Sequence, residues 1–187
     1  MPDRKPAPLE IGHGRTEFEV FLEPTCPYSK KAFAKLPALV EALGEDRITV
    51  KIRFVSQPWH LFSGIVTRAI LAASATAGGR DAAFRAMVGI YARREDFEFE
   101  DHSHGPNMDR TPREIIADIS AIVGTDLTPA FRLKSVDQAL RWHAKYVRQN
   151  GVHVSPTFAI DGIIEPALAS GQSVEEWADI VRPHLHS

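Results

Sequence analysis

Hydrophobic and polar residues alternate in two stretches near the start of the chain, at residues 17–22 and 48–55. A period of two predicts β-strands that turn one face toward a core. Between them, apolar residues recur every three or four positions from about residue 27 to residue 43, which predicts one helix. Pro37 interrupts this helix, and we expect a kink rather than an end because the apolar stripe resumes in phase. The three elements together predict a right-handed parallel unit.

Residues 58–149 show helical spacing and no strand pattern. The first two expected helices cover about 61–77 and 81–94. A third follows a capping box formed by Thr111 and Glu114 and ends near Gly124. A further helical stretch opens at Thr128, with a second start available at Ser135, and continues through Val147. The middle of the chain is therefore a helical block.

Strand character returns at residues 152–160. The dipeptide Asp161-Gly162 predicts a hairpin turn, and a short return strand follows at 163–165. A second capping box, from Ser173 to Glu176, opens a last helix. The element order is thus βαβ, a helical block and ββα, which predicts an α/β fold. We expect a flexible tail at 1–14, a core made of 15–57 and 150–187, and a helical insertion at 58–149.

Composition and charge narrow the classes of partner. The chain has 187 residues, a net charge of −2 and a single cysteine. It carries no basic patch, so neither a nucleic acid nor a membrane surface is expected as a partner. The first ten residues contain no apolar run, which argues against a secretory signal. Because one cysteine cannot form an internal disulfide, a reducing compartment fits, and we expect the protein in the cytoplasm.

The single cysteine, Cys26, lies at the predicted junction between the first strand and the first helix. It falls near the N-cap, and Pro27 falls at the first helical position. Unpaired N–H groups and the positive end of the helix dipole favour a thiolate there. An unpaired cysteine is more often a small buried hydrophobe. We favour a reactive thiol, because a core position does not require a place between two prolines at the start of a helix.

The turn Cys26-Pro27-Tyr28-Ser29, the segment 154–157 (Val-Ser-Pro-Thr) and the element order together resemble the thioredoxin fold. The helical block resembles that of the DsbA-like branch, which also includes kappa-class glutathione transferases and 2-hydroxychromene-2-carboxylate isomerases. The resemblance implies a thioredoxin-like βαβ–ββα core with an inserted all-helical subdomain. It also implies that Pro156 is cis and lies beside Cys26, with the backbone of Ser155 available to an extended thiol substrate. The residues expected to contact substrate on this basis are Pro27, Tyr28, Ser155, Pro156 and Thr157.

The sequence departs from the redox members of this family at Ser29. Those members use C-x-x-C, in which the second cysteine resolves the mixed disulfide. Here Ser29 occupies the place of that cysteine, and a hydroxyl cannot resolve a mixed disulfide. Cys26 would then be the nucleophile, Ser29 a hydrogen-bond donor to it, and an external thiol such as glutathione would release the product. No tightly bound cofactor is expected, and glutathione is a co-substrate. The substrate is a small-molecule thiol or a protein disulfide.

Two other functions are open at this point. The transferase and isomerase branch has S-P-Y-S at this turn, so the protein could instead orient glutathione sulfur toward an electrophile. It could also be a non-catalytic binding module that kept the fold. An exposed unpaired thiol would permit a disulfide-linked homodimer, but the sequence does not determine the oligomeric state.

Several other residues have a possible role. Trp59 and His60 follow the second strand at its carboxyl end, where α/β sheets place ligands, and His60 would be a proton carrier if it faces the thiol. A histidine at such a junction more often caps a helix or packs against its neighbours. His153 precedes the Ser-Pro segment. Arg148 lies on a basic helical face with Arg141 and Lys145, which could meet glutathione carboxylates, but a solvated outer face is the interpretation that we favour. Glu23, if buried, would oppose the helix dipole at the thiol. The loop residues Asp101, His102 and His104 do not make a complete metal site, and no metal is expected.

Overall fold

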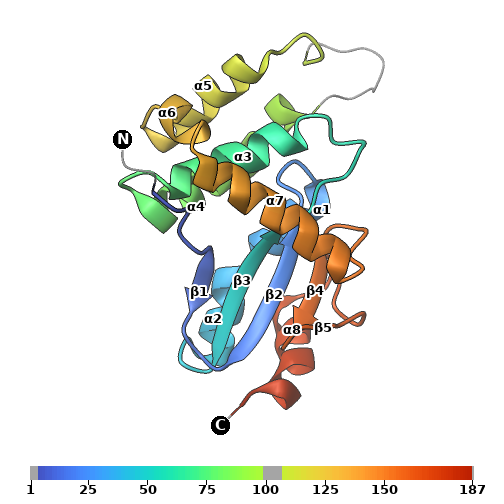
Figure 1. Ribbon diagram of the computed structural model, residues 1–187. Coiled ribbons are helices and arrows are strands. Elements are labelled where there is room, and N and C mark those ends of the chain that lie inside the picture. The colour runs from blue at the N-terminus through green and yellow to red at the C-terminus, as the bar shows by residue number, and fades with distance from the viewer. Residues whose placement is uncertain (1–3, 99–106, 187) are drawn as a thin grey trace.

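The computed structural model describes residues 4–98 and 107–186 (Figure 1). Its centre is a five-stranded sheet in the order β1-β3-β2-β4-β5. Strands β2 (Thr16–Leu22) and β3 (Ile48–Phe54) are parallel, and the other neighbouring strands are antiparallel. The α/β class and the βαβ–ββα order predicted from the sequence are confirmed.

Two of the strands differ from the prediction. Residues 10–12, which we expected in a flexible tail, form β1 (Glu10–Gly12) and pair with β3, so that prediction is wrong for this segment. Three residues are too few to produce a visible alternation, and the pairing partner is remote in sequence. The strand expected at 152–160 is shortened to β4 (Thr157–Ile160), because Pro156 has no N–H to donate to a neighbouring strand. Strand β5 (Ile163–Ile164) completes the hairpin.

The first helical stretch is divided in two. Helix α1 (Pro27–Phe33) ends before a turn at 34–35, and α2 (Leu36–Leu43) begins after it. The expected single kinked helix is therefore wrong. Pro37 cannot donate a hydrogen bond to the carbonyl of Phe33, which interrupts the helical ladder. In α2 the proline occupies the first turn, where no such donor is needed.

The block between the two halves is helical in the part that the structure describes. Both predicted capping boxes are present, and Gly124 closes α5 in the left-handed conformation. The helices are α3 (Ser63–Ser74), α4 (Gly79–Ala92), α5 (Pro112–Val123), α6 (Thr128–Phe131), α7 (Lys134–Gln149) and the C-terminal α8 (Val174–Val181), with short 3-10 helices η1 (Arg94–Phe97) and η2 (Arg182–His184). No described helix is both long and apolar enough to cross a membrane.

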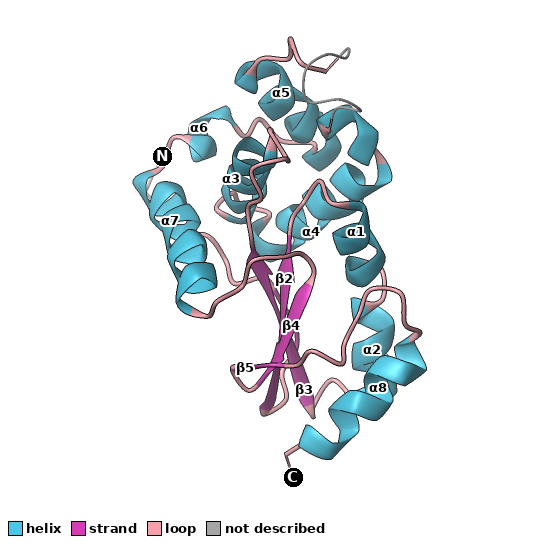
Figure 2. Ribbon diagram, turned by 90° about the vertical axis from the view of Figure 1, so that its right-hand side faces the viewer, coloured by secondary structure: helices cyan, strands magenta, loops and turns pink. Residues whose placement is uncertain are grey.

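The alternation along β2 assigns its residues to the two faces of the sheet. Phe18 packs against Phe158 and against Trp177 of α8, on the face that α2 and α8 cover (Figure 2). On the other face Phe21 stacks on Tyr146 of α7, with ring centroids 6.2 Å apart. Helices α3, α4, α5 and α6 lie beyond the end of the sheet (Figure 1). The turn that follows β2 therefore lies where the sheet meets the helical block.

Candidate active site

Cys26 is the N-cap residue of α1, with extended backbone dihedrals (φ −76°, ψ 130°) and Pro27 at the first helical position. Its Sγ donates to the carbonyl oxygen of Ser155 across 3.7 Å. Only 4% of the residue is exposed. This burial removes the basis of the argument for a disulfide-linked homodimer, which required an exposed thiol. The sulfur nevertheless faces a polar backbone group rather than a purely aliphatic core.

The peptide bond between Ser155 and Pro156 is cis, the geometry that the family resemblance implied. The Ser155 hydroxyl donates to Oε1 of Gln57 across 2.8 Å, and Gln57 is itself buried. Three segments thus meet at Ser155: the start of α1, the loop after β3 and the loop before β4. Sequence reasoning missed Gln57. The available signal was a polar side chain at the carboxyl end of a buried strand.

Ser29 is fully buried, and its Oγ accepts a hydrogen bond from the backbone N–H of Glu23 across 3.0 Å. This bond ties the first turn of α1 to the end of β2, so the serine closes the loop that carries Cys26. Its expected role as a donor to the sulfur stays a prediction. Tyr28 is 57% exposed beside it. Thr157 donates its hydroxyl to the carbonyl of Val154, which assigns that side chain a local role at the start of β4.

A buried carboxylate lies three residues before the cysteine. Oε2 of Glu23 accepts hydrogen bonds from the backbone N–H and the hydroxyl of Thr25, at 2.7 and 2.8 Å. Its second oxygen, Oε1, and the hydroxyl of Ser63 have no hydrogen-bond partner of good geometry in the described part of the chain. Burial raises the pKa of Glu23, and the charge of His60 opposes that rise. Glu23 is therefore buried, a point that the sequence left open.

His60 belongs to the same buried network. Its Nδ1 lies 2.9 Å from Oγ1 of Thr25, 3.5 Å from Oε2 of Glu23 and 3.4 Å from Oε1 of Glu98. Burial lowers the pKa of His60, the charge of Glu23 opposes this, and Arg94 adds to it. The sequence left open whether His60 faces the thiol, and the contacts of its Nδ1 connect it to two carboxylates and to Thr25, the residue before Cys26.

The helical block contributes two groups that sequence reasoning did not single out. The hydroxyl of Tyr91, on α4, donates to the carbonyl of Glu23 across 3.3 Å. Burial raises the pKa of Tyr91 well above its usual range, and the charges of Glu23 and Cys26 act in the same direction. Arg94 donates to the carbonyl of Thr25 across 3.2 Å and pairs with Glu98. Both contacts hold the cysteine turn against the insertion.

A cavity of about 360 Å³ opens next to the loop after β3. Gln57, the residue that holds Ser155, is part of its wall, and so are Arg148 and His153. Trp59, 51% exposed, forms part of the rim. The complete lining is Val55, Ser56, Gln57, Pro58, Trp59, Ala144, Val147, Arg148, Val152 and His153. The structure thus brings Trp59, His153 and Arg148 together beside the cysteine site, whereas Arg141 pairs with Asp137 away from it.

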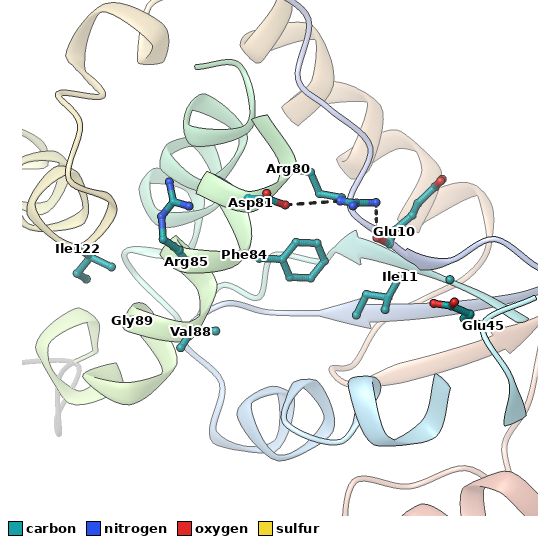
Figure 3. Close-up of a pocket in the computed structure, with 11 residues that line it drawn as sticks. Glu10, Ile11, Glu45, Arg80, Asp81, Phe84, Arg85, Val88, Gly89 and Ile122 are labelled. Carbon is teal, nitrogen blue, oxygen red and sulfur yellow. Dashed lines mark hydrogen bonds and ion pairs between the residues drawn. The ribbon is translucent and has the colours of Figure 1, made fainter. Parts of the chain in front are cut away.

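A larger cavity, of about 730 Å³, lies between β1 and α4 (Figure 3). Phe84 and Ile11 face each other across its floor, and Arg80 reaches over to the carbonyl of Glu10. None of the site residues predicted from the sequence lines it. This cavity is larger than the one beside Gln57, but the single cysteine is not among its lining residues.

Within residues 4–98 and 107–186, no group of three histidine, cysteine, aspartate or glutamate side chains is placed to hold a metal ion. Asp101, His102 and His104, which we considered as ligands, lie outside the described residues.

Comparison with known proteins determines the family. No protein-family model and no curated protein sequence matches the chain. A crystal structure from Pseudomonas syringae, provisionally named a protein-disulfide isomerase, is 51% identical to it, with a TM-score of 0.90. The alignment covers 92% of this chain and 97% of that one. The chain belongs to the DsbA-like branch of the thioredoxin-fold superfamily.

More distant DsbA-like structures share the fold. A thioredoxin-like oxidoreductase from Silicibacter pomeroyi is 19% identical, with a TM-score of 0.66, and the match covers 98% of this chain and 94% of that one. The oxidoreductase DsbA from Xylella fastidiosa is 17% identical, with a TM-score of 0.66, over 98% and 92% of the two chains. At these identities the likeness supports the DsbA-like architecture and nothing finer.

Proposed function

We propose that this DsbA-like protein is a thiol-disulfide oxidoreductase that works through Cys26 as a monothiol. The single observation that carries the proposal is the contact of the chain's one thiol with the Ser155 carbonyl, beside Pro156. That carbonyl lies at the start of β4, where the backbone of an extended substrate can pair with it. Membership of a family whose relatives carry oxidoreductase and isomerase names supports the same reaction class.

The reaction proceeds in two exchanges. The Cys26 thiolate attacks one sulfur of a disulfide, a mixed disulfide forms at Cys26, and the other sulfur leaves as a thiolate. An external thiolate then attacks the sulfur of the substrate half, so that Cys26 leaves as a thiolate and a new disulfide is released. Electrons and atoms balance without a second cysteine. Ser29 takes no part in the electron transfer, because a hydroxyl cannot form a disulfide.

Helix α1 places its N-terminal end at the proposed nucleophile. The first turn of α1 contains no acidic side chain, and Lys30 and Lys31 lie on the same helix. The N-cap position directs the free N–H groups of that turn toward Cys26. Exposed apolar side chains lie close in sequence to the residues of the site and would provide a surface for an extended substrate: Tyr28, Trp59, Leu61 and Val154.

Glutathione is the external thiol that we propose. The cavity beside Gln57 has about 360 Å³ of space, which is the size of a small-ligand site, and it carries the cationic side chain of Arg148. A glutathione whose sulfur lies at Cys26 has carboxylates on both sides, and one of them can be bound by this arginine. The mechanism needs a compartment that supplies a reduced small thiol, so the cytoplasm remains the proposed location.

Mass spectrometry tests the first exchange. After incubation with oxidised glutathione at neutral pH, we expect one glutathione per chain, attached at Cys26, and its removal by reduced glutathione. An unmodified thiol under these conditions would contradict the proposal. Conjugation of glutathione to an aryl halide that survives the Cys26→Ser substitution would instead support the transferase alternative. Failure of both reactions would leave a binding module.

Replacing Arg148 by glutamine should raise the KM for glutathione about fivefold and leave kcat nearly unchanged. Loss of one charge-assisted hydrogen bond at a partly exposed site costs about 1 kcal/mol of binding free energy, which corresponds to that factor. Steady-state kinetics with varied glutathione measures it. Arg141→Gln on the same helix is the matched control, because Arg141 pairs with Asp137 and does not line the cavity. Equal effects of the two substitutions would exclude a specific contact at Arg148.

A further inference from the structure

Three arginines surround a pocket of about 330 Å³ in the helical block, remote from Cys26 in the fold. The pocket lies between α3, α5 and α6. Its lining residues are Arg68, Arg113, Ile116, Thr128, Phe131 and Arg132. No acidic residue is among them, although the chain as a whole carries a net charge of −2. Such a local excess of positive charge requires an explanation, since like charges in one site repel each other.

Arg68 is held in place by several contacts. Its Nε donates to the carbonyl of Phe131 across 2.9 Å, and its guanidinium carbon lies 4.8 Å from the centre of the Phe131 ring. Its Nη1 lies 3.5 Å from Oδ1 of Asp137. These contacts fix one guanidinium at the wall of the pocket before any ligand arrives, which lowers the entropy cost of binding.

The other two arginines have no such partners. In the described part of the chain, neither the guanidinium group of Arg113 nor that of Arg132 makes a hydrogen bond or an ion pair with another residue. Arg113 lies in the first turn of α5, where the helix dipole disfavours a cation. The nearby acids are already engaged: Asp137 pairs with Arg68 and Arg141, and Asp126 accepts from the backbone of Thr128. Two guanidinium groups are therefore available to a bound anion.

The remaining wall is formed by Ile116, Phe131 and Thr128. Ile116 and Phe131 are both half-buried and supply an aliphatic and an aromatic surface to the same pocket. Burial of a planar apolar group between them is favourable, and Arg68 already stacks on the aromatic ring. The volume matches the lower end of small-ligand sites.

We propose that this pocket binds a small organic anion with a planar apolar body, such as an aromatic carboxylate or an aromatic phosphate ester. Arg113 and Arg132 bind the oxyanion, and Ile116 and Phe131 contact the ring. The proposal does not depend on the redox function, because no residue of the cysteine site lines this pocket.

Isothermal titration calorimetry of the full-length chain with phthalate and with phenyl phosphate tests the proposal and distinguishes the two oxyanions. We expect saturable binding of at least one of them. Benzyl alcohol provides the ring without the charge, and inorganic phosphate provides the charge without the ring, so each should bind more weakly. Equal binding of either single-feature probe would overturn the proposed combination, and no saturable binding of phthalate or phenyl phosphate would overturn the site itself.

Variants locate the binding. Arg113→Gln and Arg132→Gln should each weaken the affinity about five- to tenfold, as expected for one lost charge-assisted contact. Both side chains are exposed, so their replacement should leave the fold intact, and unchanged thermal unfolding verifies this. Arg182→Gln is the matched control, because Arg182 pairs with Asp179 on the C-terminal helix. Binding that is unaffected in both pocket variants would contradict the assignment.

Discussion

Replacing Cys26 by serine abolishes thiol–disulfide exchange, with an expected loss on the order of a thousandfold or more. An alkoxide at this position cannot form the mixed disulfide, and the chain contains no second cysteine that could substitute for it. The measurement is the glutathione-dependent reduction of a small mixed disulfide, coupled to glutathione reductase. The serine is nearly isosteric with the thiol, so the variant should keep the fold.

An independent control for this prediction uses the wild-type chain. Because Cys26 is its single cysteine, alkylation with iodoacetamide modifies one defined position. Only 4% of the residue is exposed, so we expect slow alkylation that parallels the loss of activity. Activity that survives complete alkylation, or that persists in the serine variant with an unchanged unfolding temperature, would show that the chemistry lies outside Cys26.

Replacing Glu23 by glutamine raises the free energy of unfolding at neutral pH, by roughly 0.5–2 kcal/mol, because it removes the cost of ionising a buried carboxyl group. The carboxylate is fully buried, and burial raises its pKa in the folded state above the ordinary value of 4.5. Between those two pKa values the folded state binds more protons than the unfolded state, so the stability of the wild type falls as the pH rises. Glutamine keeps a carbonyl acceptor for Thr25 and, because it does not ionise, removes this decrease of stability with pH.

The pH dependence distinguishes this effect from a simple change of packing. Below pH 4.5 both residues are neutral in both states, so the two proteins should differ little. The difference should increase toward neutral pH, as measured by urea unfolding at a series of pH values. The folded-state pKa of His60 is lowered, which makes stability rise with pH below its ordinary value of 6.5 and opposes the Glu23 effect in the wild type. Glu41→Gln, exposed on α2, is the control, and a difference that does not depend on pH would contradict the explanation.

The main elements of the fold could be predicted from local pattern. The alternation along β2 and β3, the two capping boxes and the turn at Asp161-Gly162 all depend on residues close together in the chain. The division of the first helical stretch was mispredicted. The apolar stripe remains in phase through Pro37, whereas the missing N–H breaks the hydrogen-bond ladder. Periodicity reports which side faces the core, not whether the backbone bonds continue.

Strand β1 and the buried network show a different limit. Strand β1 exists because residues 10–12 pair with residues 49–51 of β3, and the paired residues are remote in the sequence. The direction of His60 was likewise set by Glu23 and Glu98. Its position at the end of a strand allowed the imidazole either to face a ligand or to pack, and only the tertiary structure shows that it packs against carboxylates.

The sequence by itself determined the element order, the position of the single thiol at the start of a helix, and the absence of a second thiol to resolve a disulfide. Each of these follows from residues that are neighbours in the chain. Only the tertiary structure decided the surroundings of the thiol turn: the carbonyl of Ser155, 129 positions away, which accepts from the sulfur; the Gln57 side chain, which accepts from the Ser155 hydroxyl; and the burial of Glu23. The physical reason is that burial and hydrogen bonding depend on distances through space, and chain folding brings these segments together without a local pattern that records it.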